Sequence, residues 1–228
     1  VGGRSWGGVR ENGASLRIAR YGQRLSLSGT VEASRIEGRN VLDNDYFGGR
    51  LGTDYKFYDD HGQQLFIGLA ATYWNYAENQ RYYSFGHGGY YSPQSYLVAS
   101  LPLEWRGRWN RWSYRFEGAV SHSTSSEDDA PFYPTDSALQ LQAGTSPLPP
   151  GFDAPIYEGG SGSGSGYRLR GELEYRIDAQ WVVGARAGVD RSDYYEPDTF
   201  SFYFRHLFSS DAEVLSVPPR ATRHYTDF

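Results

Sequence analysis

Two small groups of side chains have the types that hydrolytic chemistry needs. One group, near the base of an expected loop, consists of His122, Ser125, Asp128 and Asp129. Glu127 and Asp128 could also be drawn as the acid pair of a glycosidase, but the sequence fixes no distance between their carboxyl groups. Acid-rich loops are usually solvated surface, so we predict that the protein is not an enzyme and has no catalytic residue.

The sequence also lacks the ligand spacing of a metal site. There is no cysteine, which excludes thiolate zinc sites, disulfides and cysteine nucleophiles. His87 stands between glycines, without a second histidine or an acidic ligand at metal spacing. We therefore expect no metal and no cofactor. The net charge of −5 gives no footprint for nucleic acid, and we expect no such partner.

Charged residues recur at every second position in several segments, which is the period of a β-strand. Over residues 167–176, tyrosine, leucine and glycine alternate with arginine and glutamate. On a helix these charges would surround the axis, whereas on a strand they share one face and leave the other apolar. The segments with this alternation are 24–35, 97–106, 112–121, 167–176 and 181–190, continued by 49–58, 64–76 and 200–208 and, more weakly, 14–20. Pro102 predicts a bulge or a local break in its strand.

This pattern predicts an all-β protein, an antiparallel transmembrane β-barrel with about 9–10 strands in this chain, each near the length that crosses a bilayer. Aromatic residues make up 17% of the chain, and several apolar faces end in Trp or Tyr, as at an interfacial belt. A soluble antiparallel sandwich would alternate in the same way and is the alternative. No apolar run has the length of a membrane-spanning helix.

The expected connections alternate between short turns and long loops. Short turns fall near residues 21–22, 59–62, 107–110 and 178–179, and longer loops near 37–45, 77–94 and 125–166, with a brief connection at 195–199. Outer-membrane barrels keep short turns periplasmic and long loops extracellular. Residues 159–166 read as a flexible Gly/Ser linker. We expect a barrel domain over residues 1–208 and a tail over 209–228 that lies in the periplasm or faces the lumen.

The polar face of the strands would line a water-filled lumen. The expected lumen residues are Glu32, Arg50, Asp54, Trp74, Glu104, Arg115, Glu117, Arg168, Arg170, Glu172, Glu174, Arg186, Asp190, Tyr203 and Arg205. Such charges could instead pair across neighbouring strands and only hold the shape of the lumen. The loop from Arg81 to Gln94 could gate the exit through Tyr82, Tyr83, Phe85, His87, Tyr90 and Tyr91, or could simply pack on its neighbours.

Three segments carry a family resemblance. Residues 81–96 read RYYSFGHGGYYSPQSY and resemble the signature RYFTYGxGGYFSPQxY of the C-terminal domain of the bacterial cellulose-synthase outer-membrane subunit, the BcsC type. Residues 38–44, GRNVLDN, are similar to GKNVxDN, and residues 127–134, EDDAPFYP, are similar to EDxxPYYP. Residues 166–184 resemble the penultimate hairpin of that family. The order and spacing agree over about residues 7–208.

The resemblance implies a sixteen-stranded porin in the bacterial outer membrane that follows periplasmic tetratricopeptide repeats and conducts nascent cellulose out of the cell. This chain would be the C-terminal part of that barrel, and we expect a signal peptide upstream of Val1 in the precursor. The implied partners are the cellulose chain, outer-membrane lipid and lipopolysaccharide, and the inner-membrane synthase complex, reached through the repeats. A general diffusion porin and a structural or adhesive barrel are the alternative functions.

Overall fold

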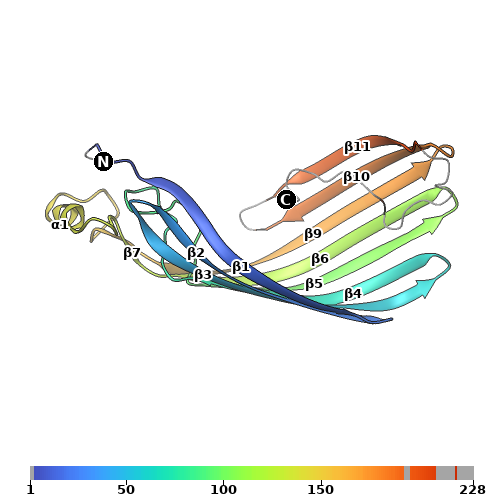
Figure 1. Cartoon of the computed structure of the whole chain (residues 1–228), viewed down its shortest axis with the longest axis horizontal. Helices are drawn as coiled ribbons and strands as arrows, with labels where there is room; N and C mark the ends of the chain where they lie inside the picture. Colours follow the sequence, from blue (N-terminus) through green and yellow to red (C-terminus); the bar gives the residue numbers. More distant parts are fainter. Residues whose placement is uncertain (1–2, 193–195, 209–218, 220–228) are drawn as a thin grey trace.

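The computed structural model describes residues 3–192, 196–208 and 219, and within them the chain is all-β. Nine strands form one antiparallel sheet in the order β1-β2-β3-β4-β5-β6-β9-β10-β11 (Figure 1). The strands are β1 (Gly7–Tyr21), β2 (Leu25–Arg39), β3 (Val41–Asp60), β4 (Gln63–Tyr76), β5 (Ser95–Trp109), β6 (Trp112–Glu127), β9 (Gly160–Arg176), β10 (Trp181–Arg191) and β11 (Asp198–His206). The antiparallel all-β prediction is confirmed.

Between β6 and β9 the chain leaves the sheet and forms a small substructure. It consists of β7 (Ala130–Pro131), the helix α1 (Ser137–Thr145) and β8 (Ile156–Tyr157), and β7 pairs with β8. Asp136 caps α1, because its carboxylate accepts a hydrogen bond from the backbone N–H of Leu139 at 2.9 Å. Figure 1 places this substructure at the end of the sheet opposite the short turns. No helix of the described residues has the length and apolarity to cross a membrane.

Two sequence predictions about loops are wrong. Residues 37–45 were expected to form a long loop, but β2 and β3 continue through this segment and meet at a tight turn on Asn40, whose φ of 50° is one that asparagine tolerates. Residues 159–166 were expected to be a flexible linker, but residues 160–166 are the first part of β9. Glycine and serine are poor strand formers alone, and here the register with β6 holds them.

Pro102 breaks one ladder without a bulge, which confirms the prediction of a local break. It pairs with Ala119 of β6, whereas the ladder between β4 and β5 skips Gly68 and Leu69 and resumes in the same register. A Cβ atom at Gly68 would lie 2.9 Å from the Pro102 ring. The glycine therefore leaves space for the ring, and the two strands keep their register. The tail over residues 209–228 lies outside the described residues, except for Pro219.

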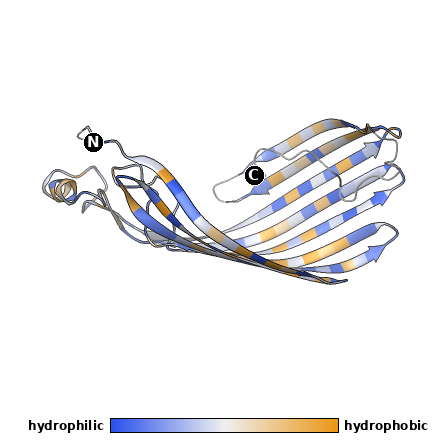
Figure 2. Ribbon diagram, in the orientation of Figure 1, coloured by the Kyte–Doolittle hydropathy of each residue, from blue (hydrophilic) through white to orange (hydrophobic). Residues whose placement is uncertain are grey.

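Hydrophobic and hydrophilic residues alternate along the strands (Figure 2), and the registers place them on opposite faces of the sheet. The registers place exposed large apolar side chains from eight strands on one face: Leu16, Leu27, Leu51, Ile67, Leu103, Phe116, Leu173 and Phe202. On β6 and β9 this apolar belt runs from Trp112 to Val120 and from Tyr167 to Tyr175. Beyond it, the same face becomes polar at His122 and Ser165. The belt is as long as the roughly 9–11 residues that a tilted strand needs to cross a bilayer.

Candidate functional site

The polar face of β5, β6, β9, β10 and β11 divides into two regions along the strands. Near the short turns it carries the charged region: Glu104, Arg106, Arg115, Glu117, Arg168, Arg170, Glu172, Glu174, Arg186, Asp190, Tyr203 and Arg205. Toward the long loops the same face of β6 and β9 carries the serine–glycine region, in which Ser121, Ser123 and Ser125 lie opposite Gly166, Gly164 and Gly162. The change falls between Arg168 and Gly166 on β9.

In the charged region, β5 and β6 share one ion-pair cluster. Glu104 forms ion pairs with Arg115 at 3.0 Å and with Arg106 at 3.1 Å, and it accepts a hydrogen bond from Arg115. Arg115 also pairs with Glu117, so one guanidinium bridges two carboxylates. The contact of Arg115 with Glu104 joins the two strands, and the other two contacts lie within one strand each. Together they give partners to half-buried charges.

Glu174 is the most enclosed charge of this region, with 0% of its residue surface exposed. Its carboxylate accepts from Tyr203 at 2.8 Å and from Arg205 at 2.9 Å, both on β11. Glu172, two positions before Glu174 on β9, pairs with Arg186 of β10 at 3.3 Å. Arg168 pairs with Asp190 at 2.7 Å. These contacts favour the shape-holding interpretation of the charges over direct contact of each charge with a ligand.

The remaining expected lumen residues lie on β2, β3 and β4. Glu32 accepts a hydrogen bond from the Tyr46 hydroxyl. Trp74 stacks on Tyr96 of β5, with ring centroids 4.1 Å apart and planes at 11°. Among the described residues, the side chains of Arg50 and Asp54 have no hydrogen bond or ion pair. They share the polar face of β3, where Arg50 lies opposite Thr72 and Asp54 opposite Gly68.

The serine–glycine region borders a hollow of about 790 Å³, which the sequence analysis did not anticipate. Its lining includes the three serines, the three glycines, Tyr91 and Tyr96. The signal was present in the sequence, because the alternation of 112–121 and 167–176 continues through these positions with serine and glycine in place of charge. The region was missed because glycine and serine are more common in linkers.

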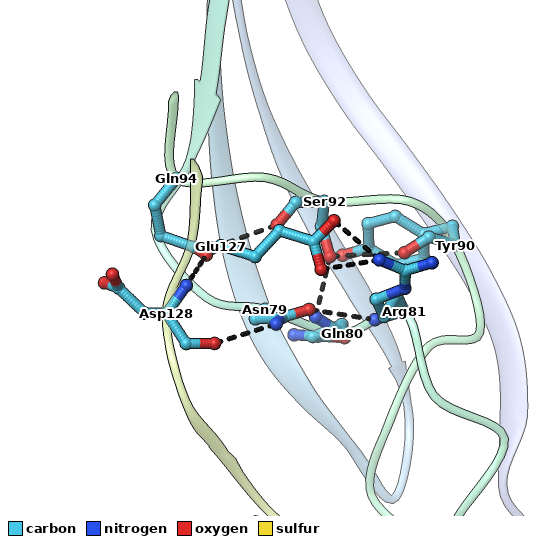
Figure 3. A network of polar contacts seen from close by, with 8 residues as sticks. All are labelled: Asn79, Gln80, Arg81, Tyr90, Ser92, Gln94, Glu127 and Asp128. Atoms are coloured by element: carbon cyan, nitrogen blue, oxygen red, sulfur yellow. Dashed lines mark hydrogen bonds and ion pairs between the residues drawn. The ribbon is translucent and has the colours of Figure 1, made fainter. Parts of the chain in front are cut away.

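The loop 77–94 beside this hollow is a packed structure held by side-chain amides (Figure 3). Gln80, with 0% of its surface exposed, accepts at its backbone carbonyl from the N–H of Gly89, and its own backbone N–H donates to Ser92 Oγ at 2.6 Å. Asn79 donates to the carbonyl of Asp128 at 2.8 Å, and the Asp128 N–H donates to Gln94 at 2.7 Å. The loop is therefore tied to the end of β6.

Two further contacts fix the loop to β3 and β6. The Asn44 side chain accepts from the N–H of Glu78 at 2.9 Å and donates to the carbonyl of Glu78 at 2.8 Å and to the Tyr90 hydroxyl at 3.0 Å. Burial raises the pKa of Tyr90 to about 12. Arg81 binds both carboxylate oxygens of Glu127 at 2.7 Å. These bonds support the packed-loop interpretation.

The six expected gating residues divide into buried and exposed ones. Phe85 and His87 are buried; Phe85 packs on Trp6, and His87 lies edge-on to Tyr82 and Tyr157. Tyr82 stacks on Tyr157 at 3.8 Å, and Tyr90 is half-buried against Asn44. The ring Nε2 of His87 donates to the Pro131 carbonyl at 2.8 Å. Burial lowers the pKa of His87, which is therefore neutral at pH 7.

Tyr83 and Tyr91 are the gating candidates that reach solvent, with 87% and 45% of their surface exposed. Tyr91 meets Tyr96 edge-on at 6.5 Å and lies under the Arg81 guanidinium at 5.7 Å. Of the six gating candidates, Tyr82 and Tyr91 border the hollow.

The possible hydrolytic group does not come together. His122 lies on the apolar side of β6, where its ring contacts Ser165 Oγ at 2.9 Å, whereas Ser125 faces the hollow on the other side. The Asp129 carboxylate accepts from the backbone N–H of Gly159 at 2.7 Å. No cluster of three or more His, Asp or Glu side chains with metal-binding geometry occurs in the described part of the chain.

The architecture and the polar face define the class: an all-β protein whose meander sheet has one apolar belt and one face of paired charges. A family model described as "Cellulose synthase operon protein C C-terminus" matches residues 1–209, and the chain belongs to this family. A cellulose synthase operon protein C of Salmonella typhimurium is 31% identical over 99% of this chain and 19% of its own length.

Other relatives agree with this assignment. A cellulose synthase operon protein C of Pseudomonas fluorescens is 28% identical over 95% of this chain and 16% of its own length. A cellulose synthase 2 operon protein C of Komagataeibacter xylinus is 33% identical over 83% of this chain and 14% of its own length. The chain thus spans about a fifth or less of the length of these curated relatives.

Proposed function

We propose that the sheet forms part of the wall of an outer-membrane β-barrel that takes part in cellulose biosynthesis, by conducting a nascent β-1,4-glucan from the periplasm to the cell exterior. The observation that carries the proposal is the two-faced sheet. Its apolar belt has the length of a bilayer-crossing strand, and its other face carries the charged region and the serine–glycine region. The names of the relatives, which refer to a cellulose synthase operon, support the choice of polymer.

The conduit is passive in this proposal, with neither a catalytic residue nor a cofactor. A neutral glucan needs hydroxyl partners and aromatic surfaces that bind it weakly, so that it enters and still moves on. The charged region has a different role in this proposal. Its arginines and carboxylates pair with each other and keep the wall rigid and hydrated. The packed loop 77–94 lies at the long-loop end, where it would stand at the exit and could act as a gate.

The partners follow from this placement. The apolar belt would contact outer-membrane lipid and lipopolysaccharide. The approach to the inner-membrane synthase complex would depend on periplasmic repeats upstream of this barrel, as the family resemblance implies. The polar ends of the strands on the long-loop side, where Arg35 pairs with Asp43 at 2.9 Å and Asp45 at 3.3 Å, would lie outside the lipid.

Deletion of the gene segment that encodes this chain tests the proposal. We expect extracellular cellulose to disappear while glucan synthesis at the inner membrane continues, which incorporation of labelled glucose into membrane-bound glucan would measure. Restoration by the intact gene is the control. Normal export after deletion would refute a conduit function.

A general diffusion porin is the second candidate, because a face rich in arginine and glutamate also suits small ions and solutes. Conductance in planar bilayers separates the two. An open, unselective ion current favours the diffusion porin, whereas a small current that cello-oligosaccharides reduce favours the glucan conduit.

A further inference from the structure

The serine–glycine region offers hydroxyl groups that the protein itself does not use. Ser121, Ser123 and Ser125 face the hollow of about 790 Å³, and within the described residues their hydroxyls have no hydrogen-bond partner in the protein. A half-buried hydroxyl gains by pairing with a ligand or with water. Three such groups at alternate positions of one strand form a row of donors and acceptors.

The opposite strand leaves room above this row. Gly162, Gly164 and Gly166 of β9 pair with the three serines and have no side chain to fill the space. A Cβ atom built at Gly162 would meet only Ser125 Oγ, at 3.7 Å, which is an ordinary contact. The backbone at Gly162 could therefore carry a larger side chain, whereas a Cβ atom at Gly166 would lie 2.7 Å from the backbone oxygen of Arg191.

Aromatic rings form one side of the hollow. Tyr96 borders it and is held in place by the stack on Trp74, and Tyr91 stands edge-on to Tyr96 with nearly half of its surface exposed. The ion pair of Arg81 and Glu127 lies at the rim. These two charges pair with each other, whereas Glu158, which also lines the hollow, adds a carboxylate that disfavours an anionic ligand.

The combination suits a neutral, flat, polyhydroxylated ligand. The row of serine hydroxyls can form hydrogen bonds with the equatorial hydroxyls of a sugar, and the tyrosine rings can pack on its apolar C–H surface. A volume of about 790 Å³ falls in the roughly 300–1,000 Å³ range of ligand sites. The opposite face of the same strands is polar here, at His122, Thr124 and Ser163, so the region lies beyond the apolar belt.

We propose that the serine–glycine region, walled by Tyr91 and Tyr96, is a binding subsite for a segment of neutral β-linked glucan at the exit end of the conduit. This inference rests on the proposed function and narrows it: the polymer binds in the serine–glycine region of the wall, and the charged region supports the shape of the lumen.

The test is direct binding of cellohexaose to the protein, purified in detergent from the envelope of its host, by isothermal titration calorimetry. In Gly162→Phe, the ring fills the hollow, and we expect the affinity to fall at least about tenfold. Tyr91→Ala removes the stacking surface and should lower the affinity for cellohexaose about fivefold. The triple change of Ser121, Ser123 and Ser125 to alanine should lower this affinity about threefold to tenfold.

Matched controls lie on the other face of β6. Thr124→Phe introduces the same ring at a position outside the lining of the hollow, and Thr124→Ala removes a hydroxyl from that same position. Both should bind cellohexaose like the unchanged protein. Heat-modifiable migration on gels checks the fold of each variant, and the triple serine change keeps the test open if Gly162→Phe does not assemble.

Several outcomes would overturn the subsite: no binding of cellohexaose by the unchanged protein, unchanged affinity in folded Gly162→Phe, Tyr91→Ala and triple-serine variants, or equal loss in the controls. Tighter binding of a charged oligogalacturonate than of cellohexaose would also do so. The proposed function is judged separately by the deletion. If export requires the gene but the subsite variants bind normally, the subsite fails and the conduit stands.

Discussion

The charged region and the serine–glycine region share two strands and one face, yet they use their side chains in opposite ways. In the charged region, Arg115 pairs with Glu104, and Arg205 pairs with Glu174. In the serine–glycine region, the hydroxyls of Ser121 to Ser125 face an open hollow without protein partners among the described residues. The difference teaches that the number of charges on a wall is a poor guide to ligand contact, because paired charges already satisfy one another within the protein.

The strongest way to break this comparison is Glu174→Ala. This change leaves Arg205 and Tyr203 without their shared carboxylate in an enclosed position, and breaking a buried pair typically costs about 3–5 kcal/mol of unfolding free energy. Urea unfolding in lipid vesicles measures it. The triple serine-to-alanine variant should change the same quantity by less than about 1 kcal/mol. Equal losses in the two variants would remove the distinction between the regions.

A second change, Asn44→Ala, tests whether the contacts of Asn44 on β3 hold the loop 77–94 in place. It removes three hydrogen bonds, two to the backbone of Glu78 and one to Tyr90, at a buried site. We expect a cost of about 1–3 kcal/mol and faster hydrogen exchange of the loop amides. The exposed Tyr83→Ala is the control and should leave exchange unchanged. Unaltered exchange in Asn44→Ala would show that other contacts suffice.

The buried His87 makes the same loop sensitive to pH. Because burial lowers its pKa in the folded state, the unfolded loop takes up a proton first as pH falls. Stability of the loop is therefore complete above about pH 6.5 and declines below that value toward the folded-state pKa. Loop hydrogen exchange at pH 7.5 and 5.0 measures this decline. In His87→Gln the dependence should flatten, and a slope that persists would assign it to another group.

The smallest effect is expected for the half-exposed pair of Arg168 and Asp190. Exposed ion pairs contribute about 0–1 kcal/mol, so either single reversal of charge should cost little, and exchanging the two residues should restore what is lost. Cellulose export should stay within about twofold in the exchanged variant, because the pair supports shape only. A large export defect with normal stability would place this pair in contact with the polymer.

The sequence allowed the sheet to be predicted where charge marks the alternation. The segments 167–176 and 112–121 were identified as strands because arginine and glutamate at alternate positions can share a face only on a strand. Residues 37–45 and 159–166 were misjudged because Asn40 and the Gly/Ser run are typical of loops in isolation. Their pairing with distant strands, visible in the β6–β9 and β2–β3 ladders, overrides that local preference.

The candidate site was harder to predict than the sheet. Alternation placed Glu174 and Arg186 on one face. Their pairing partners depend on the register between neighbouring strands, which the sequence of a single strand does not reveal. The loop signature pointed to residues 81–94, yet only the folded loop distinguishes the buried Phe85 from the exposed Tyr91. Burial in a loop depends on contacts with Trp6, Pro131 and Tyr157, which are remote in sequence.

The edges of the sheet have a consequence for biogenesis. Among the described residues, β1 and β11 each have a hydrogen-bonded neighbour on one side only. In lipid, every unpaired backbone N–H and C=O of such an edge would cost several kcal/mol, because no water is present to replace the missing partner. In the proposed membrane setting, this sheet would therefore not enter the bilayer strand by strand. Its insertion and the capture of a partner for each edge would have to occur as one concerted step.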